Sequence, residues 1–151
     1  MKIEVAKISE SGTRMQEDEP PEIMEQGIDG VVYREPIRVN VLVNLVGRTL
    51  LVQGKLISSA VLECSRCLKT FNHPIQVGDY TYTKEVKPDE TVDLTGSIRE
   101  DIILSLPMKR LCLPECKGLC PVCGQDLNLS RCDCHKSPGL NPFSGLDNLK
   151  P

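Results

Sequence analysis

The chain has 151 residues, with 18 basic and 21 acidic side chains, 8 cysteines, 3 tyrosines, 2 phenylalanines and no tryptophan. This length suits one domain of ordinary size, or one domain with a small appendage. The formal net charge of −3 excludes a basic protein that coats RNA along its length, so any contact with nucleic acid would be local or made through a protein partner. No stretch approaches the roughly 20 apolar residues of a membrane helix.

Residues 1–30 are acidic, with eight acidic and three basic side chains. Alternating apolar residues at Ile3, Val5 and Ile8 predict an edge strand, and the charged run that follows predicts an acidic surface loop. The first residues lack the continuous apolar core of an export signal. We therefore expect the protein in the cytoplasm, where thiols stay reduced.

Residues 31–86 are typical of antiparallel strands. Between residues 37 and 46 every second residue is apolar, which predicts a half-buried strand. A tight turn at Gly47 leads into a second strand that ends at Cys64. Gly54, the serine pair 58–59 and the dipeptide Gly78-Asp79 predict bulges or bends, because apolar parity shifts after the last of these.

Residues 95–106 predict one amphipathic helix. Thr95 or Ser97 can cap its start, and Pro107 ends it. Its apolar stripe consists of Leu94, Ile98, Ile102 and Leu106. We expect this helix to serve packing alone.

The eight cysteines lie unevenly along the chain. They are Cys64, Cys67, Cys112, Cys116, Cys120, Cys123, Cys132 and Cys134. Reduced thiols in CxxC pairs favour metal over disulfides, and Zn²⁺ takes four sulfur ligands in a tetrahedron. The string Cys120-Pro121-Val122-Cys123-Gly124 has the form of a zinc knuckle, in which backbone amides point at the sulfurs.

Eight thiols predict two structural zinc sites of four ligands each. The favoured partition is sequence-local, with Cys64, Cys67, Cys112 and Cys116 in one site and Cys120, Cys123, Cys132 and Cys134 in the other. The first site would clip a strand turn to the segment beyond the helix and close a loop of more than 40 residues. A rival partition joins the first CxxC pair to Cys120 and Cys123, since spacing alone does not fix the pairing.

The sequence thus predicts an α+β fold, with a mainly antiparallel β-sheet, barrel-like or open, and one packing helix. Residues 1–111 are expected to form this β domain, and residues 112–151 a cysteine-rich zinc-binding segment packed on it.

Two enzyme classes are weaker alternatives. The Cys116-x3-Cys120-x2-Cys123 spacing occurs in radical iron–sulfur enzymes, but too little chain follows it here to build their barrel. A thioredoxin-type redox pair would need a βαβ unit around its CxxC motif.

Several strings together resemble the YceD family of bacterial and plastid proteins, which is associated with accumulation of large-subunit ribosomal RNA. They are Leu62-Glu63-Cys64-Ser65-Arg66-Cys67-Leu68, Ile103-Leu104-Ser105-Leu106-Pro107, Cys116-Lys117-Gly118-Leu119-Cys120-Pro121-Val122-Cys123-Gly124 and Asn141-Pro142-Phe143. The resemblance spans roughly residues 35–149. It implies a non-enzymatic factor in the synthesis, processing or stability of 23S ribosomal RNA.

Bases near the cysteines are the candidates for RNA contact. They are Arg66, Lys69, Lys109, Arg110, Lys117, Arg131 and Lys136. The alternative is that these bases offset thiolate charge and solvate the surface. The expected partner is ribosomal RNA or a pre-ribosomal particle, reached directly or through a ribosomal protein, with no membrane and no small-molecule substrate. A second hypothesis is a zinc-stapled module that binds a basic ribosomal protein or a nuclease.

Overall fold

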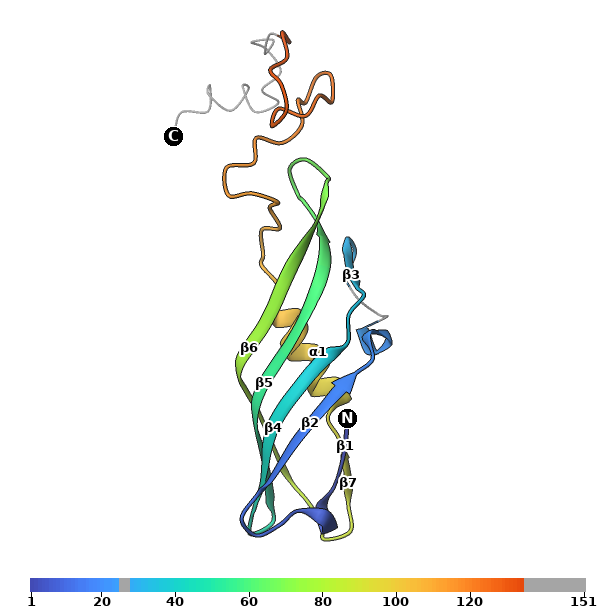
Figure 1. Cartoon of the computed structure of the whole chain (residues 1–151), viewed down its shortest axis with the longest axis vertical. Helices are drawn as coiled ribbons and strands as arrows, with labels where there is room; N and C mark the ends of the chain where they lie inside the picture. The colour runs from blue at the N-terminus through green and yellow to red at the C-terminus, as the bar shows by residue number, and fades with distance from the viewer. Residues whose placement is uncertain (25–27, 135–151) are drawn as a thin grey trace, which may run out of the picture.

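Alternating apolar residues build one long antiparallel sheet in this computed structural model, which describes residues 1–24 and 28–134. Strands pair in the order β2–β4–β5–β3, and β6 also pairs with β5 (Figure 1). Their bounds are β2 Thr13–Glu19, β3 Val31–Tyr33, β4 Ile37–Val46, β5 Thr49–Glu63 and β6 Thr70–Glu85. The sheet strands are long and twisted, and the β5–β6 hairpin projects beyond the rest of the sheet.

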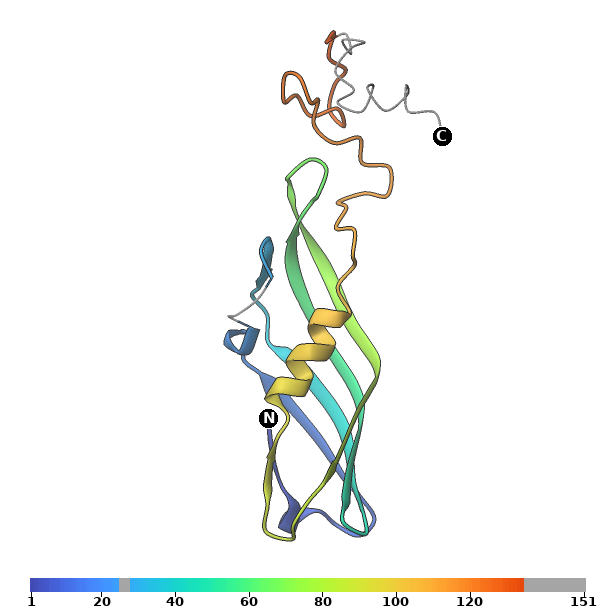
Figure 2. The same ribbon diagram turned by 180° about the vertical axis from the view of Figure 1, so that it is seen from behind.

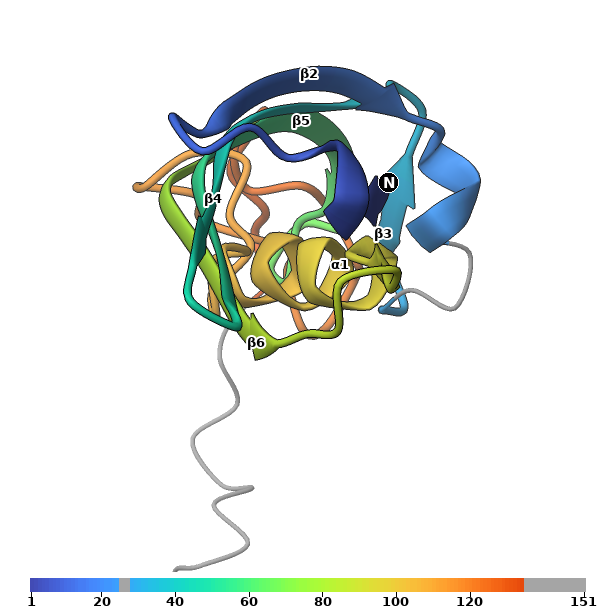
Figure 3. The same ribbon diagram turned by 90° about the horizontal axis from the view of Figure 1, so that it is seen from below.

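A second, two-stranded sheet joins β1 (Lys2–Glu4) to β7 (Thr91–Asp93). Two 3-10 helices, η1 (Val5–Lys7) and η2 (Pro21–Met24), connect the early strands. The single α-helix of the described residues, α1 (Thr95–Leu104), lies across the sheet (Figure 2). Seen from below, the sheet curls around α1, which fills the open side (Figure 3). The predicted α+β fold, mainly antiparallel with one packing helix, is confirmed.

The core lies between the concave face of the sheet and α1. Inward positions of β4 and β5 carry Val39, Val43, Leu50 and Leu56, all fully buried. From the other side α1 contributes Ile98 and Ile102. Period-two burial in the strands and period-four burial in the helix are the patterns that the sequence predicted.

One predicted bulge is present. The β5–β6 register shifts between Gly54 and Leu56, which pair with Tyr80 and Val77. The extra residue therefore lies at Gly78-Asp79 on β6, and the inward face changes from odd to even positions there. No bulge lies at the serine pair 58–59, because both residues pair with β6 in unbroken register.

The acidic run is a strand and not the predicted loop. Residues of β2 pair one by one with β4, from Thr13 opposite Val43 to Glu19 opposite Ile37. This strand was not predicted because few of its side chains are apolar. Backbone pairing with β4 holds it in place instead. Of the predicted residues, Lys136 and the Asn141-Pro142-Phe143 string lie outside the described residues.

The start of α1 also differs from its prediction. Neither Thr95 nor Ser97 caps the helix through its side chain. Instead the Thr95 N–H donates to Asp93 Oδ1 at 2.9 Å, so the aspartate at the end of β7 takes this role. The helix ends at Leu104, and the Ser105 hydroxyl donates to the Ile102 carbonyl just before Pro107.

Candidate metal centres

The tip of the β5–β6 hairpin meets the chain that leaves α1. Ser65 N–H donates to the Arg110 carbonyl at 2.8 Å, and Leu119 N–H donates to the Arg66 carbonyl at 3.1 Å. These backbone bonds hold the segment beyond the helix against the hairpin turn, and Figure 1 shows it running past that turn. Two cysteine pairs more than 40 residues apart in sequence therefore become neighbours.

The inner group consists of Cys64, Cys67, Cys112 and Cys116, whose sulfurs all lie within 4.8 Å of one another. Cys64 Sγ is 3.8 Å from Cys116 Sγ, and Cys67 Sγ is 3.5 Å from Cys112 Sγ. A disulfide would need about 2.05 Å. A tetrahedron with metal–sulfur bonds of about 2.3 Å places its sulfurs about 3.8 Å apart. The geometry fits a four-thiolate metal site.

The outer group consists of Cys120, Cys123, Cys132 and Cys134, with the same mutual limit of 4.8 Å. Cys120 is buried, Cys123 is exposed and the other two are half-buried. The grouping of the sulfurs matches the favoured partition. The rival grouping of Cys64 and Cys67 with Cys120 and Cys123 does not occur among the described residues.

One thiol of each group is prepared for ionisation. Burial acts to raise the pKa of Cys64, but backbone N–H groups at Cys112, Cys67 and Arg66 outweigh it and lower the pKa to about 6. In the outer group, N–H groups of Cys123 and Val122 lower the pKa of Cys120 to about 6. Thiolates are the metal-binding form, so these amides favour metal capture at neutral pH.

Other thiols of the groups hold their protons more tightly. A hydrogen bond with Cys67, followed by burial, raises the pKa of Cys112 to about 12. A hydrogen bond with Cys123, followed by burial, raises the pKa of Cys134 to about 12. Metal binding at either group would therefore release protons.

Both CxxC turns place the residue after the second cysteine in the left-handed region. In the outer turn this residue is Gly124, with φ of +74°. In the inner turn it is Leu68, with φ of +59°, and its role was missed because the sequence has no glycine there. Gly118 is also required, since a Cβ at this position would lie 3.0 Å from the Arg66 carbonyl oxygen.

The loop within the outer group reaches back to the inner group. Asn128 Nδ2 donates to Cys116 Sγ at 3.4 Å, and its Oδ1 accepts from Lys117 N–H at 2.8 Å. Asp126 pairs with Lys69 Nζ at 2.5 Å, and this ion pair lowers the pKa of Asp126. Sequence reasoning missed Asn128 and Asp126, because neither belongs to a ligand motif.

Several bases predicted to contact RNA are bonded within the protein. Arg66 donates to the Cys116 carbonyl at 2.6 Å, and Arg110 donates to the Asp29 carbonyl at 2.6 Å. Lys69 forms the ion pair with Asp126. The others that the structure describes, Lys109, Lys117 and Arg131, are exposed.

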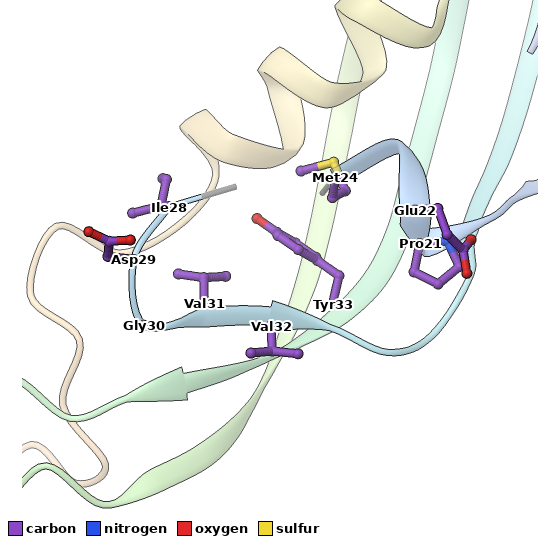
Figure 4. Close-up of a pocket in the computed structure, with 9 residues that line it drawn as sticks. All are labelled: Pro21, Glu22, Met24, Ile28, Asp29, Gly30, Val31, Val32 and Tyr33. Carbon is purple, nitrogen blue, oxygen red and sulfur yellow. The ribbon is translucent and has the colours of Figure 1, made fainter. Parts of the chain in front are cut away.

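A separate hollow of about 480 Å³ lies beside β3 and η2 (Figure 4). Met24 and Tyr33 face each other across it, with Glu22 and Asp29 at its margins. Burial raises the pKa of Tyr33, partly offset by the positive charge of Arg99. The lining holds no cysteine or histidine, and Asp29 at its margin accepts the hydrogen bond from Arg110.

Comparison with known proteins finds a family that matches the second half of the chain. Residues 79–150 match the family described as "Large ribosomal RNA subunit accumulation protein YceD". Over these residues the chain is similar to the YceD family. The matched segment holds six of the eight cysteines, including the whole outer group.

Proteins similar to this chain occur in bacteria and plants. An uncharacterized protein of Mycobacterium leprae is 30% identical over 124 residues, covering 71% of this chain and 57% of that protein. One from Mycobacterium tuberculosis is 35% identical over 100 residues, covering 56% and 48%. The chain spans about half the length of these relatives.

A maize protein is named "Large ribosomal RNA subunit accumulation protein YCED homolog 1, chloroplastic". It is 39% identical over 61 residues, covering 38% of this chain and 21% of that protein. No solved structure matches the chain. None of the helices in the described part of the chain has the length and apolarity needed to cross a bilayer.

Proposed function

We propose that this chain is a zinc-binding factor, without catalytic activity, that supports accumulation of large-subunit (23S) ribosomal RNA by acting in its processing or in ribosome assembly. The observation that carries the proposal is the overlap of the YceD match with the cysteine groups. Zinc binding needs reduced thiols, so we propose the cytoplasm as the compartment.

The donor set supports zinc in a structural role. Four thiolates satisfy a tetrahedral ion completely, whereas catalytic zinc keeps a position open for water or substrate. Cys64, Cys67, Cys112 and Cys116 would hold one ion, and Cys120, Cys123, Cys132 and Cys134 the other. The ions would tie together loops that have few apolar contacts of their own.

Two measurements test this proposal together. Metal analysis of protein purified without added zinc should give two Zn²⁺ per chain, and one or fewer would contradict the two-site arrangement. In cells depleted of the protein, the ratio of large-subunit to small-subunit ribosomal RNA should fall and be restored by the wild-type gene.

Matched variants connect the metal to the RNA. Cys64→Ser and Cys120→Ser should lose metal and fail to restore the ratio. Ser65→Ala changes an exposed side chain in the same turn and should restore it fully. Restoration by a cysteine variant that has lost its metal would show that zinc is not needed for this function.

A second candidate is a zinc-stapled module that acts through a basic ribosomal protein or a nuclease. Two observations favour it: Arg66, Lys69 and Arg110 already have partners within the protein, and β2 exposes Glu17 and Asp18 at the edge of the sheet.

Crosslinking in cells separates the two routes. If RNA is contacted directly, reversing the charge of Lys109, Lys117 and Arg131 should reduce RNA crosslinks and weaken their dependence on salt. If a basic protein is the contact, Glu17→Lys with Asp18→Lys should remove protein crosslinks and leave RNA crosslinks unchanged.

A further inference from the structure

The two cysteine groups differ in their access to solvent. In the inner group Cys64, Cys67 and Cys116 are 0%, 4% and 1% exposed, and Cys112 is half-buried. In the outer group only Cys120 is buried, at 6%, and Cys123 is exposed. A chelator or a competing thiol can reach the outer sulfurs directly, whereas the inner sulfurs are covered by Phe71, Leu111 and Leu119.

The outer loop also supports the inner group. In the sequence, Asn128 lies between Cys123 and Cys132 of the outer group. Its side-chain amide nevertheless donates to the Cys116 sulfur of the inner group. The loop is anchored near this point by the ion pair between Asp126 and Lys69, two residues after Cys67. Asp126 Oδ1 accepts from Asn128 N–H at 2.9 Å and from Asn128 Nδ2 at 2.7 Å, so one carboxylate orients the amide.

From these contacts we infer that the two sites are energetically coupled, with the outer site exchanging metal and its loop setting the affinity of the inner site through Asn128. This inference rests on the proposed metal binding. A metal ion in the outer group would fix the loop from Cys120 to Cys134 and hold the Asn128 amide against Cys116. A donor at a ligating sulfur stabilises the thiolate and orients it.

Coupling of this kind is reciprocal. If filling the outer site strengthens the inner site, filling the inner site strengthens the outer one by the same factor. Asn128 is a positioning residue in this scheme, since it acts on the metal through Cys116. Loss of the outer ion should therefore loosen the inner ion even though no inner ligand has changed.

The experiment uses the full chain in zinc–chelator buffers that set the free Zn²⁺ concentration. At each concentration a brief pulse of an alkylating reagent is followed by mass mapping of the modified cysteines. Protection of Cys64 and Cys116 reports the inner site, and protection of Cys120 and Cys123 reports the outer site. The wild-type chain should lose outer protection first when chelator is added.

Cys134→Ser removes an outer ligand and should raise the Zn²⁺ concentration that half-protects Cys116 by about tenfold, at the lower end of the effects known for outer-shell partners. Asn128→Ala should have a similar effect with all eight cysteines intact. Adding Cys134→Ser to Asn128→Ala should then weaken the inner site little further, because the coupling has already been removed.

Lys69→Met provides a second variant that leaves both ligand sets and Asn128 in place. Its matched control is Lys55→Met, an exposed lysine on β5 far from the cysteine groups. Lys69→Met should weaken the inner site and Lys55→Met should not.

Equal half-protection of Cys116 in the wild type, Cys134→Ser and Asn128→Ala would overturn the coupling while leaving two-site zinc binding intact. Absence of zinc-dependent protection in the wild type would instead overturn the proposed metal binding, and the coupling with it.

Discussion

At the scale of single residues, Leu68 holds the most strained backbone position among the described non-glycine residues. It is the one such residue with a positive φ, and its side chain is 58% exposed. We predict that Leu68→Gly stabilises the protein by about 0.5–1 kcal/mol, because glycine adopts this conformation without steric cost and little buried surface is lost. Urea unfolding of the zinc-loaded protein would measure the gain.

The control for this prediction is Leu113→Gly, an equally exposed leucine at 60% with no positive φ. It should leave stability unchanged or lower it, because glycine then adds only conformational freedom to the unfolded chain. If Leu68→Gly destabilises as much as this control, the left-handed turn holds no relievable strain.

Residue types and spacing were enough to predict the ligand groups, but not the residues that support them. Cysteines show their chemistry in the sequence, and the favoured partition followed from their local spacing. Asn128 could not be predicted, since an asparagine twelve residues after Cys116 has no sequence signal for a bond to its sulfur. The left-handed conformation of Leu68 was not predicted, because such turns are recognised in a sequence by a glycine.

At the scale of elements, a hydrogen bond joins α1 to the sheet across the core. Tyr80 on β6 donates its hydroxyl to Ser97 Oγ at 3.2 Å, and its ring is 1% exposed. Tyr80→Phe should lower the free energy of unfolding by about 1 kcal/mol, because the ring packing is kept and only the hydrogen bond is lost. Tyr82→Phe, at a half-buried position on the same strand, is the control and should change stability less. Equal effects in urea unfolding would show that the bond to Ser97 contributes nothing specific.

The start of α1 provides a pH-dependent test. Hydrogen bonds from Thr95, first from its side chain and then from its N–H, hold the pKa of Asp93 below its ordinary value of 3.8. A carboxylate whose pKa is lowered by folding stabilises the protein above that ordinary value and loses this contribution as the pH falls through the folded pKa. Asp93→Ala should therefore cost about 1 kcal/mol at pH 7 and clearly less at pH 3.

Asp93→Asn keeps an oxygen that can accept from Thr95 N–H but removes the charge. Its stability relative to Asp93→Ala should not change between pH 7 and pH 3, as measured by urea unfolding at both values. A constant difference between the wild type and Asp93→Ala at both pH values would mean that the ionised carboxylate is not what stabilises this helix start.

Strands that bury one face were predictable because burial imposes period two on their side chains, as in β4 and β5. The parity shift on β6 even located its bulge, since an extra residue at Gly78-Asp79 must reverse the inward face. β2 was not predictable in this way. Its ordering comes from pairing with β4, and its charged positions show no apolar alternation.

At the scale of the whole molecule, buried apolar residues form two separate clusters. The larger consists mainly of sheet and α1 side chains and contains no cysteine. The smaller lies at the hairpin tip and consists mainly of Cys64, Cys67 and Cys116. The larger cluster buries enough apolar surface to stabilise the sheet without metal. The cluster at the tip buries too little to order its loops alone.

Removal of metal should therefore unfold the tip and leave the body folded. With a strong chelator and reductant present, we expect far-UV circular dichroism to keep the β signal of the sheet. Amide hydrogen exchange should accelerate at Ser65 and Leu119, which bond across the tip, and stay slow at Val41 and Val52 in the sheet. Exchange reports local opening directly, so the two regions are read in one sample. Returning one equivalent of Zn²⁺ should slow exchange less than two equivalents. Concerted loss of the sheet signal with the metal would show instead that the cysteine tip and the body fold as one unit.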